Sequence, residues 1–100
     1  MRLSLPEQKA ICDAIHRADS AATVFLYGSR VRDDLKGGDI DLLVLSETIS
    51  FGVRIQILSE IKEQIGEQKI DLLVKTPQQA ATDPFVTQVL LGAVKLEERL

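Results

Sequence analysis

The sequence predicts an α/β (α+β) fold: one small domain, residues 1–100, with a mixed β-sheet and helices packed mainly on one face. Apolar runs of strand length at 23–27, 40–45 and 69–74 alternate with segments whose apolar residues recur every three or four positions. The pentapeptide Ile-Asp-Leu-Leu-Val occurs in both of the later runs, but its flanks do not match. We therefore interpret these runs as strands of one sheet and not as a duplicated domain.

Composition narrows the classes of function. The formal net charge of -3 argues against direct nucleic-acid binding, because neutralising many phosphates needs a surplus of Lys and Arg. The single cysteine, Cys12, excludes an internal disulfide framework and is expected to be a small buried side chain. No apolar run approaches the roughly 20 residues that span a bilayer, and the N-terminus lacks signal-peptide features. We expect a cytoplasmic protein without a membrane segment.

The first element is predicted to be a helix from Ser4 to about Asp19. Ser4 and Glu7 have the spacing of a capping box, and an apolar stripe follows at helical spacing. His16 lies just off that stripe and is interpreted as an ordinary surface histidine, because no second ligand stands at metal-binding spacing.

The central part of the chain is predicted to form two strands joined by a polar turn. The run 23–27 predicts a strand buried on both faces and ended by Gly28. A brief helical turn is expected within 29–35, before Gly37 and Gly38 reverse the chain into the strand at 40–45.

The second half is predicted to hold the longest helix, a third strand and a short C-terminal helix. The long helix follows residue 50 and ends at Gly66 in a left-handed conformation. The Gln-, Ala- and Thr-rich segment after Pro77 predicts a loop. Residues 84–91 predict a helix capped by Gly92, and 93–97 a last edge strand.

The chemistry-bearing residues begin with Asp39 and Asp41. Two residues apart in an extended segment, their side chains share one face and repel each other unless a cation lies between them. Hard divalent ions such as Mg²⁺ are held by one or two carboxylates together with substrate phosphates. Asp71 stands at the same place in the third strand, where an ionised acid among apolar residues is costly without a partner or a metal. It is a candidate third ligand and a candidate base.

A candidate phosphate site precedes these acids. Gly28 allows close approach of the backbone, Ser29 offers a hydroxyl donor, and a helix starting here would add its positive end. The cations Arg30, Arg32 and Lys36 lie between the two motifs. Each motif alone also has a purely structural interpretation. The Gly-Ser pair could be a common turn, the paired acids a turn former or helix cap, and the cations a solvated basic loop. Their combination is the signal.

These residues resemble the DNA polymerase β nucleotidyltransferase superfamily, and within it most closely the minimal nucleotidyltransferases. The resemblance lies in the segments 28–32, 38–42 and 70–72. It implies the palm-like fold of that superfamily. Two sequence features depart from the usual pattern, since Val31 and Asp33 replace small residues and the gap from the Gly-Ser pair to the paired acids is short.

The resemblance also implies roles for the site residues. Gly28 and Ser29 would hold the triphosphate of ATP, Asp39 and Asp41 would bind two Mg²⁺ ions, and Asp71 would complete the cluster and activate the acceptor. The acids are intact, which argues against an inactive copy.

The resemblance further implies a partner. Such proteins are often the antitoxins of helical HEPN ribonuclease toxins, and some transfer AMP from ATP to a tyrosine of the toxin. We therefore expect a protein adenylyltransferase that forms a hetero-oligomer with a HEPN-type toxin. One alternative is a small-molecule transferase of the aminoglycoside type, although those enzymes generally carry a further helical domain for the acceptor. The other is a nucleotide-binding antitoxin that acts by occlusion.

The C-terminal segment favours a partner on separate grounds. It carries more apolar residues than one short helix and an edge strand need, so part of this surface is expected to be exposed; the alternative is that these residues complete the core. They are Phe85, Val86, Val89, Leu90, Leu91, Val94 and Leu96.

Overall fold

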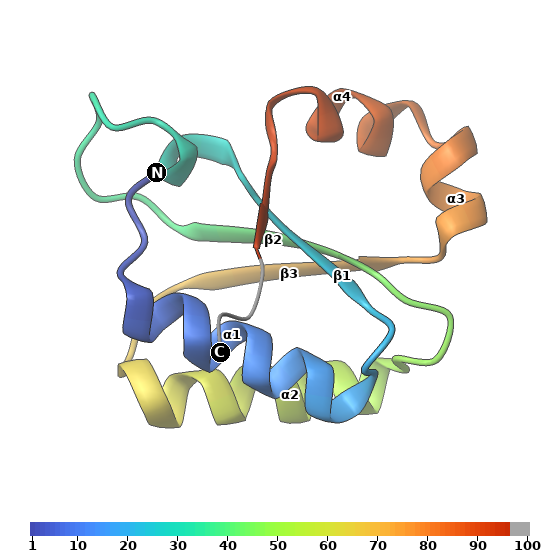
Figure 1. The fold of residues 1–100 in the computed structure, drawn as a ribbon, viewed down its shortest axis with the longest axis horizontal. Helices are drawn as coiled ribbons and strands as arrows, with labels where there is room; N and C mark the ends of the chain where they lie inside the picture. The colour runs from blue at the N-terminus through green and yellow to red at the C-terminus, as the bar shows by residue number, and fades with distance from the viewer. Residues whose placement is uncertain (97–100) are drawn as a thin grey trace.

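A four-stranded sheet with the strand order β3-β2-β1-β4 forms the centre of residues 1–96, the part of the chain that this computed structural model describes. The strands are β1 (Thr23–Tyr27), β2 (Ile40–Leu45), β3 (Ile70–Lys75) and β4 (Val94–Leu96). The helices are α1 (Leu5–Ala18), α2 (Phe51–Ile65), α3 (Pro77–Thr82) and α4 (Pro84–Gly92), and a 3-10 turn, η1, occupies Gly28–Val31. The sheet separates α1 and α2 from α3 and α4 (Figure 1).

The strand pairing confirms the predicted mixed sheet. β1 is antiparallel to β2, and β2 is parallel to β3. The repeated pentapeptide sets the parallel register, because Ile40 pairs with Ile70 and Asp41 with Asp71. β4 pairs antiparallel with β1 as an edge strand, while residue 97 of the predicted strand lies outside the described residues.

The main core lies between the sheet and the two long helices. The capping box of Ser4 and Glu7 starts α1 as predicted, and Ile11 and Ile15 on this helix are fully buried. Ile57 and Ile61 of α2 meet them under the sheet. A fully buried side chain of this size contributes about 1.5–3 kcal/mol relative to an exposed one. Cys12 is buried in the same cluster, as predicted.

A second, smaller core lies on the other face of the sheet. Leu43 of β2 and Val86 of α4 are fully buried there, and Phe25 of β1 packs beside them. The helices therefore cover both faces, with the two long ones on one face as predicted and two short ones over part of the other (Figure 1). β1 is correspondingly buried fully on one face and partly on the other, not fully on both.

Three local predictions were wrong. Gly92 is the last residue of α4 and not its cap, which is Ala93. The segment after Pro77 is the helix α3 and not a loop, because Thr76 and Gln79 form a capping box around a proline in the first turn. Gly66 ends α2 with φ 87° as expected, but ψ is -175°, which is not the left-handed helical conformation. No helix of residues 1–96 is long and apolar enough to cross a membrane.

Candidate active site

Three predicted acids meet at one end of the sheet, on the face opposite α1 and α2. The register places Asp41 between Asp71 of β3 and Tyr27 of β1. Ile40 and Leu42, the residues on either side of Asp41 in β2, are buried in the main core. Because side chains alternate between the faces of a strand, Asp41 points to the other face. α3 and α4 pack farther along this face, over Leu43 and its neighbours.

The surroundings of Asp41 raise its pKa. Burial raises the pKa of Asp41, and the charge of Asp71, a hydrogen bond with it and the charge of Asp39 raise this pKa further. Burial, followed by the charges of Asp41 and Asp71, raises the pKa of Tyr27. Asp71 itself is exposed to solvent. The expectation that Asp71 is an acid buried among apolar residues was therefore wrong, because β3 is an edge strand with this part of its face open.

Asp39 precedes β2 and stands at the rim of the cluster. Its Oδ2 lies 3.4 Å from Nζ of Lys69, the residue directly before β3. Both side chains are largely exposed, so this pair contributes little to stability. The Lys69 charge also acts in the direction of a lower pKa at Asp41. Lys69 therefore supplies a cation beside the acids, one that sequence reasoning did not single out.

Two glycines let the Gly-Ser turn lie directly against the acids. Gly28 has φ 74°, and a Cβ on it would stand 2.3 Å from Oδ2 of Asp41. Gly38 has φ 92°, and a Cβ on it would stand 2.4 Å from Oγ of Ser29. A side chain fits at neither position, so only glycine allows this approach of backbone to functional group. The turn and the paired acids, ten residues apart in sequence, thus form one site.

Two arginines hold the loop that carries this turn. Arg2 donates to the carbonyl oxygens of Ser29, Arg32 and Gly37 at 2.9, 2.7 and 2.7 Å. Arg30 donates to the carbonyl oxygens of Gly38 and Arg2 at 3.1 and 3.0 Å. These five bonds fix both ends of the loop between η1 and β2.

The predicted basic residues therefore have different surroundings. Arg30 is directed at loop backbone, and its Nη2 also reaches Oε1 of Gln68 at 3.3 Å. Arg32 is exposed and pairs with Asp34, with Nη2 and Oδ2 2.7 Å apart. Lys36 is exposed. Direct contact of these three side chains with phosphate stays a prediction. η1 is a single turn, shorter than the helical segment expected within 29–35.

Comparison with known families bears on this arrangement. The sequence matches the family described as Polymerase beta, Nucleotidyltransferase over residues 9–99. The chain belongs to this family. The comparison of this sequence with curated proteins found no match. The fold, a small mixed sheet with four helices in residues 1–96, is consistent with that of a polymerase β-like nucleotidyltransferase, and general nucleotidyl transfer is the activity that the family supports.

Members of this nucleotidyltransferase family generally use a divalent metal and a nucleoside triphosphate, and the donor set suits such an ion. Within residues 1–96, no three His, Cys, Asp or Glu side chains are arranged as a complete metal-binding group. Mg²⁺ does not require one, because it is commonly held by one or two carboxylates, waters and substrate phosphates. The absence of a side chain on Gly28 brings its backbone close to the carboxylate of Asp41, a hard oxygen ligand.

The candidate site includes residues that the sequence analysis did not single out. Tyr27 ends a strand and lies opposite Asp41, which could have been inferred had the antiparallel register been known. Arg2 lies 27 residues before Ser29, and nothing in the sequence indicates that the two meet.

We expect Arg2→Ala to loosen the Gly-Ser loop. The variant loses three hydrogen bonds from a charged donor, which is expected to lower the free energy of unfolding by about 1–2 kcal/mol and to weaken MgATP binding. Arg2→Lys keeps the charge but not the planar guanidinium that reaches three carbonyl oxygens. It should therefore lose nearly as much stability and MgATP affinity as Arg2→Ala. Urea denaturation and hydrogen exchange of the amides in 28–38 measure the effect.

Arg17→Ala is the matched control, because this arginine pairs with Glu60 on the surface between α1 and α2. It should cost at most about 1 kcal/mol and leave exchange in 28–38 unchanged. Wild-type exchange rates and MgATP affinity in Arg2→Ala would show that Arg2 does not position the loop.

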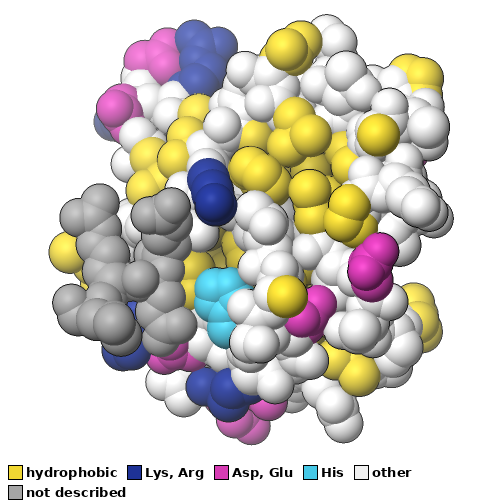
Figure 2. All heavy atoms as spheres, turned by 45° about the vertical axis from the view of Figure 1, so that its right-hand side comes forward, with side chains coloured by type: hydrophobic (Ala, Val, Ile, Leu, Met, Phe, Trp, Pro, Cys, Tyr) yellow, Lys and Arg dark blue, Asp and Glu magenta, His cyan; other side chains and the backbone are white. Residues whose placement is uncertain are grey.

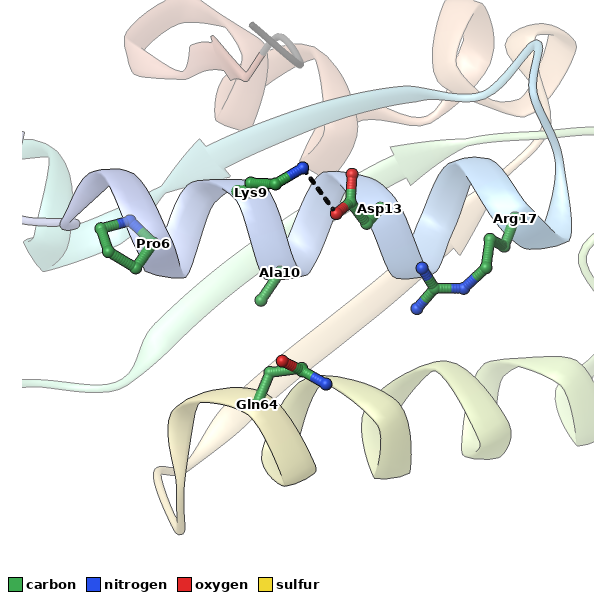
Figure 3. A pocket seen from close by; sticks show the side chains of 6 residues that line it. All are labelled: Pro6, Lys9, Ala10, Asp13, Arg17 and Gln64. Carbon is green, nitrogen blue, oxygen red and sulfur yellow. Dashed lines mark hydrogen bonds and ion pairs between the residues drawn. The ribbon is translucent and has the colours of Figure 1, made fainter. Parts of the chain in front are cut away.

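A separate groove between α1 and α2 lies away from this site, on the other face of the sheet. Figure 3 shows Ala10 and Arg17 on the side of α1 toward Gln64 of α2, while Lys9 and Asp13 pair on the opposite side of α1. Lys9 and Asp13 pair at 3.1 Å, and Arg17 pairs with Glu60 at 2.9 Å. Its charges are thus satisfied within the helical layer, and the acid cluster is the better candidate for chemistry.

Proposed function

We propose that this nucleotidyltransferase transfers AMP from ATP to a hydroxyl group of a partner protein, a tyrosine of a HEPN-type helical toxin, and so acts as an antitoxin. One observation carries the proposal: the acid cluster lies on an open part of the sheet face, beside a helix with exposed apolar side chains. Asp71 is exposed, and Phe85 and Leu91 of α4 are 56% and 78% exposed. An open reactive face bordered by apolar surface suits a folded acceptor.

The proposed roles follow from the placement of each group. Gly28 and Ser29 would hold the triphosphate, and Asp39 and Asp41 would hold Mg²⁺, which supplies positive charge to the phosphates when it is bound. Asp71, the exposed acid of the cluster, would accept the proton of the acceptor hydroxyl. The hydroxyl oxygen forms a bond to the α-phosphorus, and the bond to the leaving pyrophosphate breaks.

The direct test is incubation with ATP labelled at the α-phosphate, Mg²⁺ and the product of the adjacent reading frame as the proposed partner. Label on the partner is the result that the proposal predicts. Label on an added small acceptor such as an aminoglycoside, and none on the partner, would favour the small-molecule enzyme. Neutralisation of the toxin without any label would favour occlusion.

The apolar side chains of α4 give a prediction about assembly. In the described chain, Val86 and Leu96 are buried and complete the core, whereas Phe85 and Leu91 remain exposed. Apolar side chains gather in the half of the molecule where α3 and α4 lie (Figure 2). We expect Phe85→Asp with Leu91→Asp to dissociate the complex with the partner while the isolated chain stays folded.

Phe51→Asp is the matched control, because Phe51 is 74% exposed on α2, in the layer on the other side of the sheet. Size exclusion with light scattering should give one heavy species for wild type and for Phe51→Asp, and two separate species for the α4 double variant. A wild-type chain that elutes apart from the partner at micromolar concentration would contradict the proposed hetero-oligomer.

A further inference from the structure

A groove of about 340 Å³ runs between η1 and the C-terminal half of α4. Val31 of η1 and Val89 of α4 line it, together with Arg32 directly after η1, and Tyr27 lines it next to the sheet. Tyr27 and Val89 are half-buried parts of the second core, which holds the groove in place. The volume is within the range of small-ligand sites, roughly 300–1,000 Å³.

The groove borders the candidate active site, because Gly28 belongs to both. Gly28 lines it, and the same glycine approaches Oδ2 of Asp41 so closely that a Cβ would stand 2.3 Å away. Tyr27, also part of the lining, is paired in register with Asp41. A nucleotide with its phosphates at Gly28 and the acids therefore has this groove beside it for the remainder of the molecule.

The lining suits a flat heteroaromatic base. Val31, Val89 and Tyr27 are apolar lining residues that such a ring would contact. The one side-chain amide in the lining is that of Gln88, which is exposed on α4. An amide donates and accepts side by side, and this is the pattern that pairs with the N6 and N7 atoms of adenine. Guanine presents two acceptors at the corresponding edge and matches it less well.

We propose that the groove between η1 and α4 binds the base of the nucleotide and that Gln88 selects adenine. This inference rests on the proposed function for the identity of the nucleotide. It assigns the choice of base to α4, the same helix whose exposed side chains are proposed to contact the partner. Base recognition and partner docking then involve the same short helix.

The test is isothermal titration of the isolated chain with ATP, GTP and tripolyphosphate, each in excess Mg²⁺. We expect wild type to bind ATP at least about fivefold more tightly than GTP, and Gln88→Ala to abolish this difference, as the loss of a bidentate pair requires. Tripolyphosphate affinity should stay the same in Gln88→Ala. Gln78→Ala, on α3 and outside the groove lining, is the control and should keep the preference for ATP.

A second variant fills the groove without straining the backbone. Gly92 lines the groove, its φ is not positive, and a Cβ on it would meet no atom within 4 Å. Gly92→Leu should weaken the binding of ATP by at least about tenfold and leave the affinity for tripolyphosphate unchanged. If Gly92→Leu does not fold, Gln88→Ala decides alone, since its side chain is exposed. Equal binding of ATP and GTP by wild type, an unchanged ratio in Gln88→Ala, or no nucleotide binding would each overturn the inference.

These outcomes are separable from those of the proposed function, because the titration contains no acceptor. Selective ATP binding without transfer to the partner would refute the protein acceptor and leave the base-binding groove standing. Transfer to the partner with ATP and GTP equally would leave the acceptor standing and refute the groove.

Discussion

The double substitution Asp39→Asn with Asp41→Asn is expected to reduce the rate of nucleotidyl transfer by at least about a thousandfold. These are the carboxylates proposed to hold Mg²⁺, and loss of several kcal/mol of charge stabilisation in the transition state corresponds to that factor. MgATP binding should also weaken, because the two asparagines no longer hold the ion whose positive charge offsets that of the triphosphate. Single-turnover transfer and isothermal titration measure the two effects.

The fold of this double variant should be intact. Asp13→Asn is the matched control, since Asp13 pairs with Lys9 on α1 and lies on the other face of the sheet. It should leave transfer unchanged. Equal MgATP affinity in wild type and the double variant would refute the assignment of Asp39 and Asp41 as the metal-holding pair.

Asp41 also gives a prediction of how stability depends on pH. The folded pKa of Asp41 is raised, through burial first and then the charges of Asp71 and Asp39, so the folded state binds protons more readily than the unfolded state. In the absence of metal, stability should therefore fall as pH rises from the ordinary pKa of an aspartate through the raised one. Asp41→Asn should remove this slope and be at least as stable as wild type at neutral pH.

The second large effect is expected for Asp71→Asn, with a loss in turnover of at least about a hundredfold. The variant keeps the size and hydrogen-bonding ability of the side chain but removes the proposed base, and general-base assistance is commonly worth that factor. Because Asp71 is exposed, unfolding free energy should change by less than about 0.5 kcal/mol. MgATP binding should weaken less than in the double variant.

Glu67→Gln is the control for Asp71, because Glu67 is an exposed acid in the turn before β3. Single-turnover transfer separates the chemical step from product release. If Asp71→Asn transferred at the wild-type rate in that assay, Asp71 would have no part in the chemistry.

The part of the site that the sequence predicts best is the part fixed by repetition along strands. Two copies of Ile-Asp-Leu-Leu-Val aligned in register bring Asp41 beside Asp71, and period-two alternation puts both on one face. The burial of Asp71 was predicted wrongly because an apolar strand sequence does not tell a central strand from an edge strand with an open face. Strand order is a tertiary property.

The sequence also contains a local signal for α3, the capping box of Thr76 and Gln79. Thr76 and Gln79 enclose Pro77 with the same spacing as Ser4 and Glu7 around Pro6, so α3 has the signal that correctly predicted α1. The polar composition of the segment outweighed that signal in the prediction of a loop. The contacts of Arg2 are different, because they join residues about 30 positions apart and depend on the finished fold.

The central claim, that this site transfers a nucleotidyl group, is tested most directly with ATP labelled in two positions. Parallel reactions with the product of the adjacent reading frame as acceptor would contain ATP labelled at the α- or at the γ-phosphate, with Mg²⁺ or with a chelator. Nucleotidyl transfer predicts that the α-label moves to the acceptor in the presence of Mg²⁺, while the γ-label leaves with pyrophosphate. Transfer of the γ-label to the acceptor, or α-label transfer that survives in Asp39→Asn with Asp41→Asn, would contradict it.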